Sequence, residues 1–509
     1  MAEYDGTAAN DGRDFAEWAA RYSQRTNRSL AGARIALPTT ADNDGDDTMY
    51  TFAMQTDDHD DAEQTYTFAA QAAQWGMIVD RKSVDGGIPA NNNVADAREL
   101  SGKDAIDYAE RHMTVLRTLM AQLRKTVDFT GVRIAVCLVL EPKTAVLLRQ
   151  LKAAGATVGV FADPSETDQR VADQLTSEGI AVEANVCWTP EQTQAGALRL
   201  LDTIRPQIII DDGASFARLA AAERPELLRD LIGVAEETTS GVRAFQAMQD
   251  AGALDFPVIA VNDSVLKTGF DNEHGTGETC VTTMQELLGA HCFDDTNVAV
   301  IGYGPVGRGF ARRVRALGAN VVICDTDPVA ALKAVFDGFA AQDIDDAVAN
   351  ARIVVSATGV RHTIAVEHMR LMHSGTVLSV IGGIANEIAL DDIPGFRHDN
   401  ARTISEISVP DGPTLTLLAE GDGVNYTAGG GNPIEIMDLS FAVQSSAVAR
   451  LLESRATAGD QLAPGLHRLD AASDRRIAQV ALHTRGFAAS HAVADNGYDW
   501  QLTRFADIQ

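Results

Sequence analysis

Apolar residues in this chain fall into short runs that alternate with stretches of helical spacing. The runs VRIAVCLVL (132–140) and QIIIDDG (207–213) are typical of strands, and TAVLLRQLKAAG (144–155) is typical of a helix that ends at Gly155. Because parallel neighbours need a crossover, usually a helix, this alternation predicts a parallel, doubly wound sheet.

A second alternating unit begins at NVAVIGYG (297–304) and continues through VVICD, IVVSATG and TVLSVIGG. The 509 residues are too many for one core, so two or three domains are expected. The predicted fold class is α/β, with two doubly wound Rossmann-like domains. Residues 1–93 form an acidic N-terminal extension with a strand signal at 29–38, a helix signal at 68–79 and a loop-like end at 83–93.

The charge balance argues against two kinds of partner. Seventy-one acidic residues against 42 Lys and Arg give a formal net charge of −29, which repels nucleic acids and anionic membranes. No signal peptide and no apolar run of about 18 residues is seen, so we expect no membrane span and a cytoplasmic location. A high-salt habitat and a GC-rich genome would each account for the acidity.

The five cysteines are odd in number and contain no C-x-x-C pair. This pattern argues against a disulfide framework and against a zinc site. We therefore expect small buried thiols and no metal centre.

A G-x-G-x-x-G fingerprint lies between a predicted strand and a predicted helix, in NVAVIGYGPVGRGFARRVRALGANVVICDTD. The helix N-terminus would offer N–H donors to a pyrophosphate, and the acid that ends the next strand would accept from a ribose 2′-hydroxyl and repel a 2′-phosphate. A glycine-rich turn without a ligand is the alternative, but the strand, helix and acid together favour bound NAD. The predicted NAD-binding residues are Gly302, Gly304, Pro305, Val306, Gly307 and Asp325.

The stretch VNDSVLKTGFDNEHGTGE (261–278) gathers Asn262, Lys267, Asp271 and Asn272 just before this fingerprint. Such a set can hold vicinal hydroxyls, because a lysine moves a hydroxyl proton while a carboxylate and an amide fix orientation. A surface ion pair on a helix is an equally good interpretation of the spacing alone.

Four separate motifs resemble the S-adenosyl-L-homocysteine hydrolase family and occur in its order. They are IIIDDG (208–213), AEETTSGV (235–242), VNDSV-x-K-x-x-FDN followed by G-Y-G-x-V-G-x-G, and LAEGDGVNYTAGGGNP (418–433). The resemblance covers about residues 94–485. It implies an NAD domain, 276–433, inserted into a substrate domain of residues 94–275 and 434–509.

The resemblance also implies a reaction and its residues. Bound NAD oxidises a ribose 3′-hydroxyl, the 4′ proton becomes acidic, the 5′ substituent leaves, water adds and the hydroxyl is restored. Lys267 and Asp271 would handle the 3′-hydroxyl, Asp212 would take the 4′ proton, and Glu237 would hold the 2′-hydroxyl with Asn262. The implied contacts with the cofactor or its carboxamide are Thr238, Thr239, Ser240, Asn272 and Asn425.

The chain departs from the family pattern in the part implied to contact the base and the 5′ position. In place of the family's C-L-H-M-T-x-E-T-A stands CLVLEPKTA, and a cysteine after FDN is Thr276. The lysine- and tyrosine-bearing C-terminal tail has no match. Substrate-site positions that carry a different residue here are Val139, Glu141, Lys143, Gly383 and Asn432.

Three functions remain open at this point. The chain could be a diverged family enzyme that acts on an altered ribosyl or nucleoside thioether. It could be an NAD-dependent nucleoside or sugar oxidoreductase or epimerase, or a catalytically silent NAD-binding paralogue. The third is disfavoured, because drift in a silent protein would not spare Asp212, Glu237, Lys267 and Asp271 together. The implied partners are a small ribosyl substrate and further copies of the chain, as a dimer or tetramer.

Overall fold

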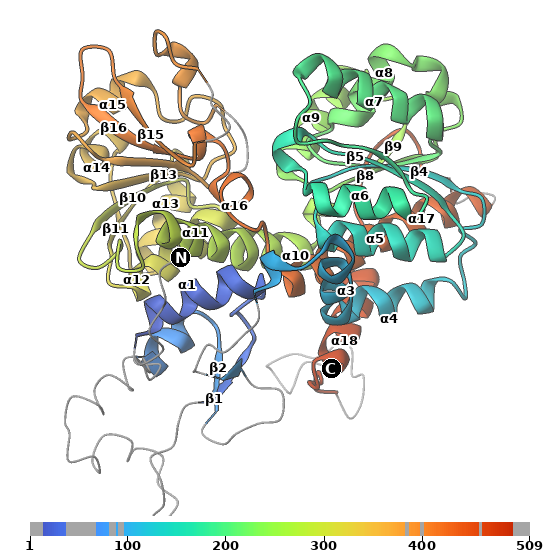
Figure 1. Ribbon diagram of the computed structural model, residues 1–509, viewed down its shortest axis with the longest axis horizontal. Helices are drawn as coiled ribbons and strands as arrows, with labels where there is room; N and C mark the ends of the chain where they lie inside the picture. The colour runs from blue at the N-terminus through green and yellow to red at the C-terminus, as the bar shows by residue number, and fades with distance from the viewer. Residues whose placement is uncertain are drawn as a thin grey trace, which may run out of the picture.

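Two lobes, each built on a seven-stranded sheet, lie side by side in the computed structural model (Figure 1). The structure describes residues 14–36, 68–80, 88–89, 96–381, 386–397, 402–457 and 461–491. Gly383 and the C-terminal tail lie outside these residues.

The first lobe contains an entirely parallel sheet of strand order β17-β9-β8-β7-β4-β5-β6. Its edge strand β17 comes from the C-terminal part of the chain and pairs with β9. The strands are β4 (Arg133–Cys137), β5 (Thr157–Phe161), β6 (Ala181–Glu183), β7 (Ile208–Asp211), β8 (Gly233–Glu236), β9 (Pro257–Ala260) and β17 (Gly465–His467).

The second lobe has the order β12-β11-β10-β13-β14-β16-β15, parallel except for the hairpin partner β15. The strand order reverses on either side of β10, which places a crevice at the carboxyl end of that strand. The strands are β10 (Asn297–Ile301), β11 (Asn320–Cys324), β12 (Ala340–Ala341), β13 (Ile353–Ser356), β14 (Val377–Val380), β15 (Ile404–Ser408) and β16 (Thr414–Leu418).

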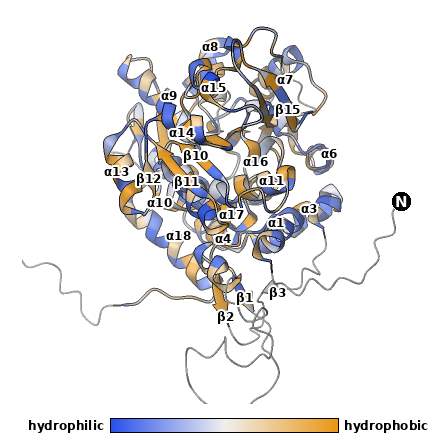
Figure 2. Cartoon of the chain, turned by 90° about the vertical axis from the view of Figure 1, so that its left-hand side faces the viewer, coloured by the Kyte–Doolittle hydropathy of each residue, from blue (hydrophilic) through white to orange (hydrophobic). Residues whose placement is uncertain are grey.

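Helices cover both faces of each sheet, and in Figure 2 the strands are mainly hydrophobic while helices such as α3 and α18 carry hydrophilic faces. The first lobe has α3 (Gly102–His112), α4 (Thr114–Leu123), α5 (Pro142–Ala153), α6 (Gln169–Ser177), α7 (Pro190–Ile204), α8 (Ser215–Glu223), α9 (Thr239–Asp250), α17 (Ile434–Ala456) and α18 (Ala471–Thr484). The second has α11 (Gly277–Leu288), α12 (Pro305–Ala316), α13 (Pro328–Phe336), α14 (Ile344–Asn350), α15 (Val366–Leu371) and α16 (Val424–Thr427).

The lobes join through α10 (Val265–Lys267), a π-helical stretch at residues 268–276, and α11. A Cβ on Gly309 would lie 1.9 Å from the carbonyl oxygen of Glu273, so only glycine allows α12 to approach the π-helical stretch this closely. The residues that begin the chemistry motif are thereby held at the lobe junction, beside α10 in Figure 1.

Part of the N-terminal extension is folded against the second lobe. Helix α1 (Phe15–Thr26) lies beside α11 beneath the lobe junction, and residues 68–74 form a second helix. Strands β1 (Arg34–Ala36), β2 (Ile78–Asp80) and β3 (Ile88–Pro89) make a small parallel sheet. Aromatic side chains bury this unit in the core of the second lobe: Phe15, Trp18, Tyr22, Phe68 and Trp75.

The predicted fold class is confirmed: both lobes are doubly wound α/β units. The prediction of buried thiols is wrong for Cys187, which is exposed, and for Cys292, which is half-buried; all five cysteines are free. Within the part of the chain that the structure describes, no helix is long and apolar enough to cross a bilayer.

Candidate active site

Lys267 and Asp271 form a buried ion pair at the lobe junction. Lys267 Nζ lies 3.1 Å from Asp271 Oδ1 and donates to Asn272 Oδ1 at 3.1 Å. The two side chains are only 6% and 3% exposed, so the interpretation as a surface ion pair is wrong. Burial alone would lower the pKa of Lys267, but Asp271 and Glu237 outweigh it and raise the pKa, keeping an ammonium in place.

Asp271 is fixed by two further donors. Its Oδ1 accepts from Asn432 Nδ2 at 2.9 Å, and its Oδ2 accepts from Ser440 Oγ at 2.8 Å. Ser440 lies on the long buried helix α17, so the carboxylate is held between the lobe junction and the core of the first lobe. A carboxylate with this many partners keeps its orientation when a substrate arrives.

Asn262 connects this pair to the start of α9. Its Oδ1 accepts from Thr239 Oγ1 at 3.0 Å and from Asn272 Nδ2 at 3.5 Å. The predicted polar set is therefore brought together from three segments of the chain.

The acids Asp211 and Glu236, which precede the two predicted acids, are structural. Asp211 accepts the backbone N–H groups of Asp212, Phe216 and Ala217. Glu236 accepts from the N–H groups of Gly213, Ala214 and Thr238 and from the Thr238 hydroxyl. These bonds fix the turns at the carboxyl ends of β7 and β8, from which Asp212 and Glu237 project.

Glu237 is buried and makes no hydrogen bond with the described residues. The amide of Gln444 lies near it, outside good hydrogen-bonding geometry, and slightly counteracts the burial that raises the pKa of Glu237 to about 8. Leaving a buried carboxyl unpaired costs about 1–3 kcal/mol, which makes this group a candidate partner for a ligand hydroxyl. Burial also raises the pKa of Asp212, against the opposing effects of Thr238 and Lys267.

The predicted cofactor residues of the first lobe start α9. Thr238 is the N-cap, and its hydroxyl contacts Ser240 Oγ at 3.2 Å. Arg243 of the same helix donates to the carbonyl oxygens of Thr358 and Gly359 in the second lobe, at 3.5 and 3.2 Å. The beginning of α9 therefore faces the crevice that follows β10.

The glycine fingerprint forms a tight turn between β10 and α12. Gly302 has φ +101°, and a Cβ there would lie 2.9 Å from the Ala357 carbonyl. A Cβ on Gly307 would lie 2.0 Å from the Gly302 carbonyl, whereas nothing lies within 4 Å of one on Gly304. Gly304 therefore leaves open space at the N-terminus of α12, where Pro305 and Val306 begin the helix.

Asp325 follows β11, and its carboxylate accepts the N–H of Tyr303 at 2.7 Å and of Asp327 at 2.8 Å. Asn425 is buried and donates to Thr279 Oγ1 and Asn432 Oδ1, at 3.2 and 3.1 Å. The open glycine, the free helix N-terminus and the acid at the next strand end fit a dinucleotide whose ribose carries a 2′-hydroxyl.

A cavity of about 390 Å³ lies between the lobes. Its lining includes three of the positions that depart from the family pattern: Val139, Glu141 and Lys143. Tyr426 and the glycine run 429–431 form another side. The predicted sugar-handling residues do not line the cavity, but Asn432 connects them to its wall, because its carbonyl accepts from Lys143 and its amide donates to Asp271.

Lys143 and Glu141 neutralise each other. Lys143 Nζ lies 2.7 Å from Glu141 Oε2 and also meets the side-chain oxygen of Asn27 and the carbonyls of Gly430 and Asn432, at 2.7, 3.1 and 2.7 Å. Four acceptors surround three ammonium hydrogens, so Lys143 has none to spare for a ligand. Burial raises the pKa of Glu141, and Lys143 opposes the shift.

Asn432 faces the polar set rather than the cavity. Its amide donates to Asp271 and to Thr276 Oγ1, and its Oδ1 accepts from Asn425. His274 is three residues past Asp271, a position that makes it a candidate acid or base, but it lies against Arg313; burial and that guanidinium lower its pKa to about 4.

Sequence reasoning missed two residues of the cavity wall. Asn27 comes from the extension, which has no motif, and a contact across 116 residues leaves no local signal. Glu166 lies beside Val139, because Leu140 N–H donates to the Glu166 carbonyl and Asp168 N–H donates to the Leu140 carbonyl, both at 2.8 Å. Enclosure of its carboxyl by the cleft walls and nearby Asp212 raise the pKa of Glu166 to about 8, although the residue as a whole is exposed.

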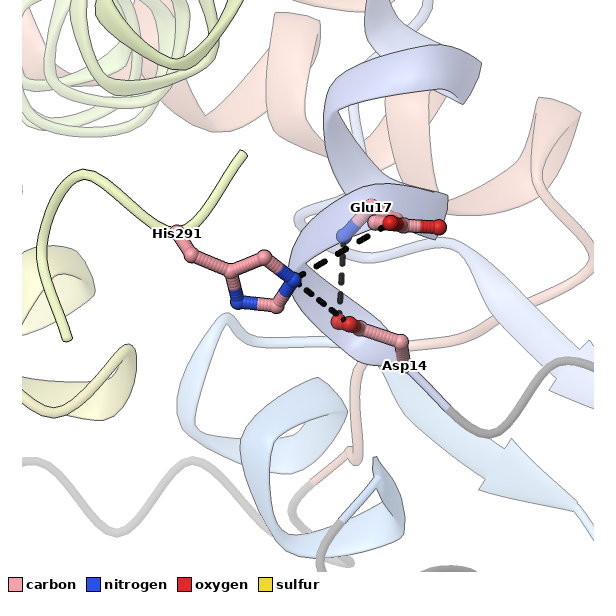
Figure 3. Close-up of side chains that lie close together, drawn as sticks. All are labelled: Asp14, Glu17 and His291. Carbon is pink, nitrogen blue, oxygen red and sulfur yellow. Dashed lines mark hydrogen bonds and ion pairs between the residues drawn. The ribbon is translucent and has the colours of Figure 1, made fainter. Parts of the chain in front are cut away.

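One further cluster lies away from the cavity. His291 Nε2 lies 2.9 Å from Asp14 Oδ2 and 4.0 Å from Glu17 Oε1 (Figure 3). The group is partly exposed, and its ion pairs attach the start of α1 to the second lobe.

Comparisons with known proteins agree with this geometry. The family model for S-adenosyl-L-homocysteine hydrolase matches residues 91–223, and the model for its NAD binding domain matches residues 289–431. S-inosyl-L-homocysteine hydrolase of Methanopyrus kandleri is 38% identical over 390 residues, which cover 76% of this chain and 91% of that protein.

Two further relatives have similar coverage. Adenosylhomocysteinase of Thermococcus kodakarensis is 40% identical over 393 residues, covering 76% of this chain and 91% of the relative. S-inosyl-L-homocysteine hydrolase of Methanothermobacter thermautotrophicus is 36% identical over 397 residues, covering 76% and 92%. With its NAD-binding lobe and its match to both family models, the chain belongs to the S-adenosyl-L-homocysteine hydrolase family of NAD-dependent enzymes.

Proposed function

We propose that this protein hydrolyses a purine ribosyl thioether of homocysteine through transient oxidation of the ribose 3′-hydroxyl. The observation that carries the proposal is a buried carboxyl without a partner, Glu237, beside the fixed pair Lys267 and Asp271. A ribose 2′-hydroxyl satisfies the first, and the neighbouring 3′-hydroxyl meets the second.

Each polar residue has a distinct task in this mechanism. Lys267 and Asp271 remove and return the 3′-hydroxyl proton, while Asn432 and Ser440 keep Asp271 in position. NAD, held at Gly302, Gly304, Gly307 and Asp325, would supply hydride removal and return at C3′. Asn262 and Asn272 align the lysine with the start of α9, where Thr238, Thr239 and Ser240 would face the cofactor.

Asp212 is the base for the 4′ proton. Its raised pKa makes it a stronger base than an ordinary carboxylate. Loss of the 4′ proton next to a 3′ ketone expels the 5′ thiolate, and water then adds to the same carbon.

Glu166 is the acid that serves the leaving sulfur. It lies beside Val139, where the family pattern has a histidine, and it lines the same cavity. A carboxyl whose pKa is raised toward neutral pH holds its proton more readily than an ordinary glutamate and can donate it to a thiolate.

Glu141 is the group that reads the base. One of its oxygens is held by Lys143, and its carboxylate makes no other hydrogen bond or ion pair with the described residues. The other oxygen can therefore accept from a donor on the purine edge. Hypoxanthine offers N1–H and adenine its 6-amino group. We favour hypoxanthine, because the positions implied to contact adenine are changed here and two of the relatives are named for S-inosyl-L-homocysteine.

The test is thiol release from S-inosyl- and S-adenosyl-L-homocysteine by the purified protein supplied with NAD. The proposal predicts release from both, with the higher kcat/KM for the inosyl compound. Reduced NAD or an epimer without thiol would instead indicate an oxidoreductase or epimerase. Absence of both thiol and reduced NAD with every ribosyl ligand would indicate a silent paralogue.

A further inference from the structure

The N-terminal segment 14–36 lies outside both family-model matches, yet it contacts both lobes at the cavity. On the second lobe, the N–H groups of Leu30 and Ala31 donate to Glu278 at 2.7 and 3.3 Å. On the first lobe, Arg28 and the N–H of Ser29 meet Glu435 at 2.5 and 3.0 Å. The end of α1 is therefore fixed at the lobe junction from two sides.

Asn27 ends α1 in the left-handed conformation, with φ +48°. This backbone turns its side chain toward the cavity wall, where Oδ1 accepts from Lys143 and Nδ2 donates to the carbonyls of Gly430 and Gly431 at 2.9 and 3.3 Å. Its own carbonyl accepts the N–H of Ile434 at 2.9 Å. One residue thus ties Lys143 to the glycine run.

The neighbouring residues of α1 form part of the same wall: Ser23, Gln24, Thr26 and Asn27. The hydroxyl of Ser23 bonds to Thr282 at 3.1 Å, and that of Thr26 bonds to the Tyr22 carbonyl at 2.8 Å. The carboxamide of Gln24 makes no hydrogen bond with the described residues. An amide presents a donor and an acceptor side by side, which matches the edge of a purine.

We propose that the N-terminal segment completes the base pocket: Gln24 contacts the purine edge, and Asn27 positions Lys143, Glu141 and the glycine run. The inference deepens the proposed function and rests on it. If the Asn27 side chain is removed, Lys143 keeps three acceptors, but Gly430 and Gly431 lose the donor that fixes their carbonyls. We then expect Lys143, and with it Glu141, to be held less firmly against the base. Asn27 is a positioning residue, because it acts through Lys143.

The experiment compares Asn27→Gly with Asn27→Asp. Glycine keeps the left-handed backbone without strain and removes only the side chain, and aspartate restores the acceptor for Lys143. Losing these bonds predicts an increase of about tenfold in KM for S-inosyl-L-homocysteine, with kcat within about twofold. Asn27→Asp recovers part of the increase, and Gln24→Ala raises KM by about fivefold or more.

Two controls distinguish an effect on the base pocket from a general effect on the folded protein. Asp411→Gly changes a residue with the same backbone conformation, φ +54°, away from the cavity and leaves KM unchanged. S-ribosylhomocysteine, which lacks a base, keeps the same KM with Asn27→Gly as with the unchanged protein. Equal KM increases with and without the base, or no increase for the inosyl substrate, would overturn the inference.

Binding of inosine, measured by calorimetry, distinguishes this inference from the proposed function. If the unchanged protein binds inosine but releases no thiol, the proposed function fails. The inference then stands only if Asn27→Gly and Gln24→Ala weaken inosine binding. If inosine does not bind the unchanged protein, both fail.

Discussion

At the scale of single residues, consecutive acids take different roles according to the donors around them. Glu236 accepts two backbone N–H groups and both donors of Thr238, whereas the carboxyl of Glu237 has no hydrogen-bond partner among the described residues. Glu236 holds a turn, whereas Glu237 is the group that we propose binds a ribose hydroxyl. The sequence distinguished them only through the family resemblance, because two adjacent glutamates have the same chemistry until their neighbours in the fold are known.

Replacing Glu237 by Gln is expected to raise stability and lower activity. Because the folded pKa of Glu237 is raised from 4.5 to about 8, the native state loses stability as pH rises from the unfolded to the folded value. The advantage of Glu237→Gln should therefore grow across this range and reach about 1–3 kcal/mol above it. Chemical denaturation at several pH values measures it.

Glu236→Gln is the matched control for that prediction. One amide oxygen cannot accept from all the donors that Glu236 serves, so this variant should be less stable by about 1–3 kcal/mol. The account of the two acids is wrong if both variants shift stability in the same direction.

Glu166→Gln is expected to separate oxidation from elimination. Without the acid, thiol release should slow by about a hundredfold while the absorbance of reduced NAD still appears with substrate. In the unchanged protein the rate should fall as pH rises through about 8, because the acid form is lost, and the variant should lack that fall. Asp173→Asn, on an exposed face of α6, is the control; an unchanged pH profile in Glu166→Gln would refute the role.

At the scale of elements, local pattern predicted most of the strands and helices but not where tertiary contacts intervene. The apolar runs around β4, β7 and β10 became strands, and the glycine fingerprint formed the expected turn. The helical spacing of residues 95–124 predicts a continuous helix, but α3 ends and α4 begins at Met113. There Asp438 accepts the N–H groups of Val115 and Leu116, so a carboxylate more than 300 residues away begins α4.

The same limit applies to the site. Motifs predicted which polar residues gather around Lys267 and where the nucleotide turn forms, because each motif is short and its residues are close in sequence. The ion pair between Glu141 and Lys143 and the hydrogen bond from Lys143 to Asn27 could not be predicted in this way. They depend on segments that meet only in the folded chain. A sequence shows that a charge has changed, but the compensating partner appears only in three dimensions.

Helix α1 gives a prediction at this scale. Asp14 caps it by accepting from Glu17 N–H at 3.2 Å and also pairs with His291. Asp14→Ala should weaken the helix by about 0.5–2 kcal/mol and increase amide hydrogen exchange over residues 15–26. Exchange in the parallel strands of both lobes should stay unchanged; unchanged exchange in α1 would show that neither contact holds it.

At the scale of the whole molecule, acidic residues exceed basic ones by 71 to 42, so repulsion across the surface opposes the compact state. Added salt screens this repulsion within about 3 Å at 1 M. The melting temperature should therefore rise steadily between about 0.1 and 1 M potassium chloride. A melting temperature that is constant or falls over this range would contradict a dominant role for surface repulsion.

The central claim is that a ribose lies between Glu237 and the Lys267–Asp271 pair and gives its 3′ hydride to the cofactor before the thioether breaks. Stopped-flow absorbance with S-inosyl-L-homocysteine carrying deuterium at C3′ tests it most directly. The account predicts that the absorbance of reduced NAD appears before thiol and more slowly with deuterium than with hydrogen. Thiol release without any reduced NAD, at the same rate for both isotopes, would contradict it.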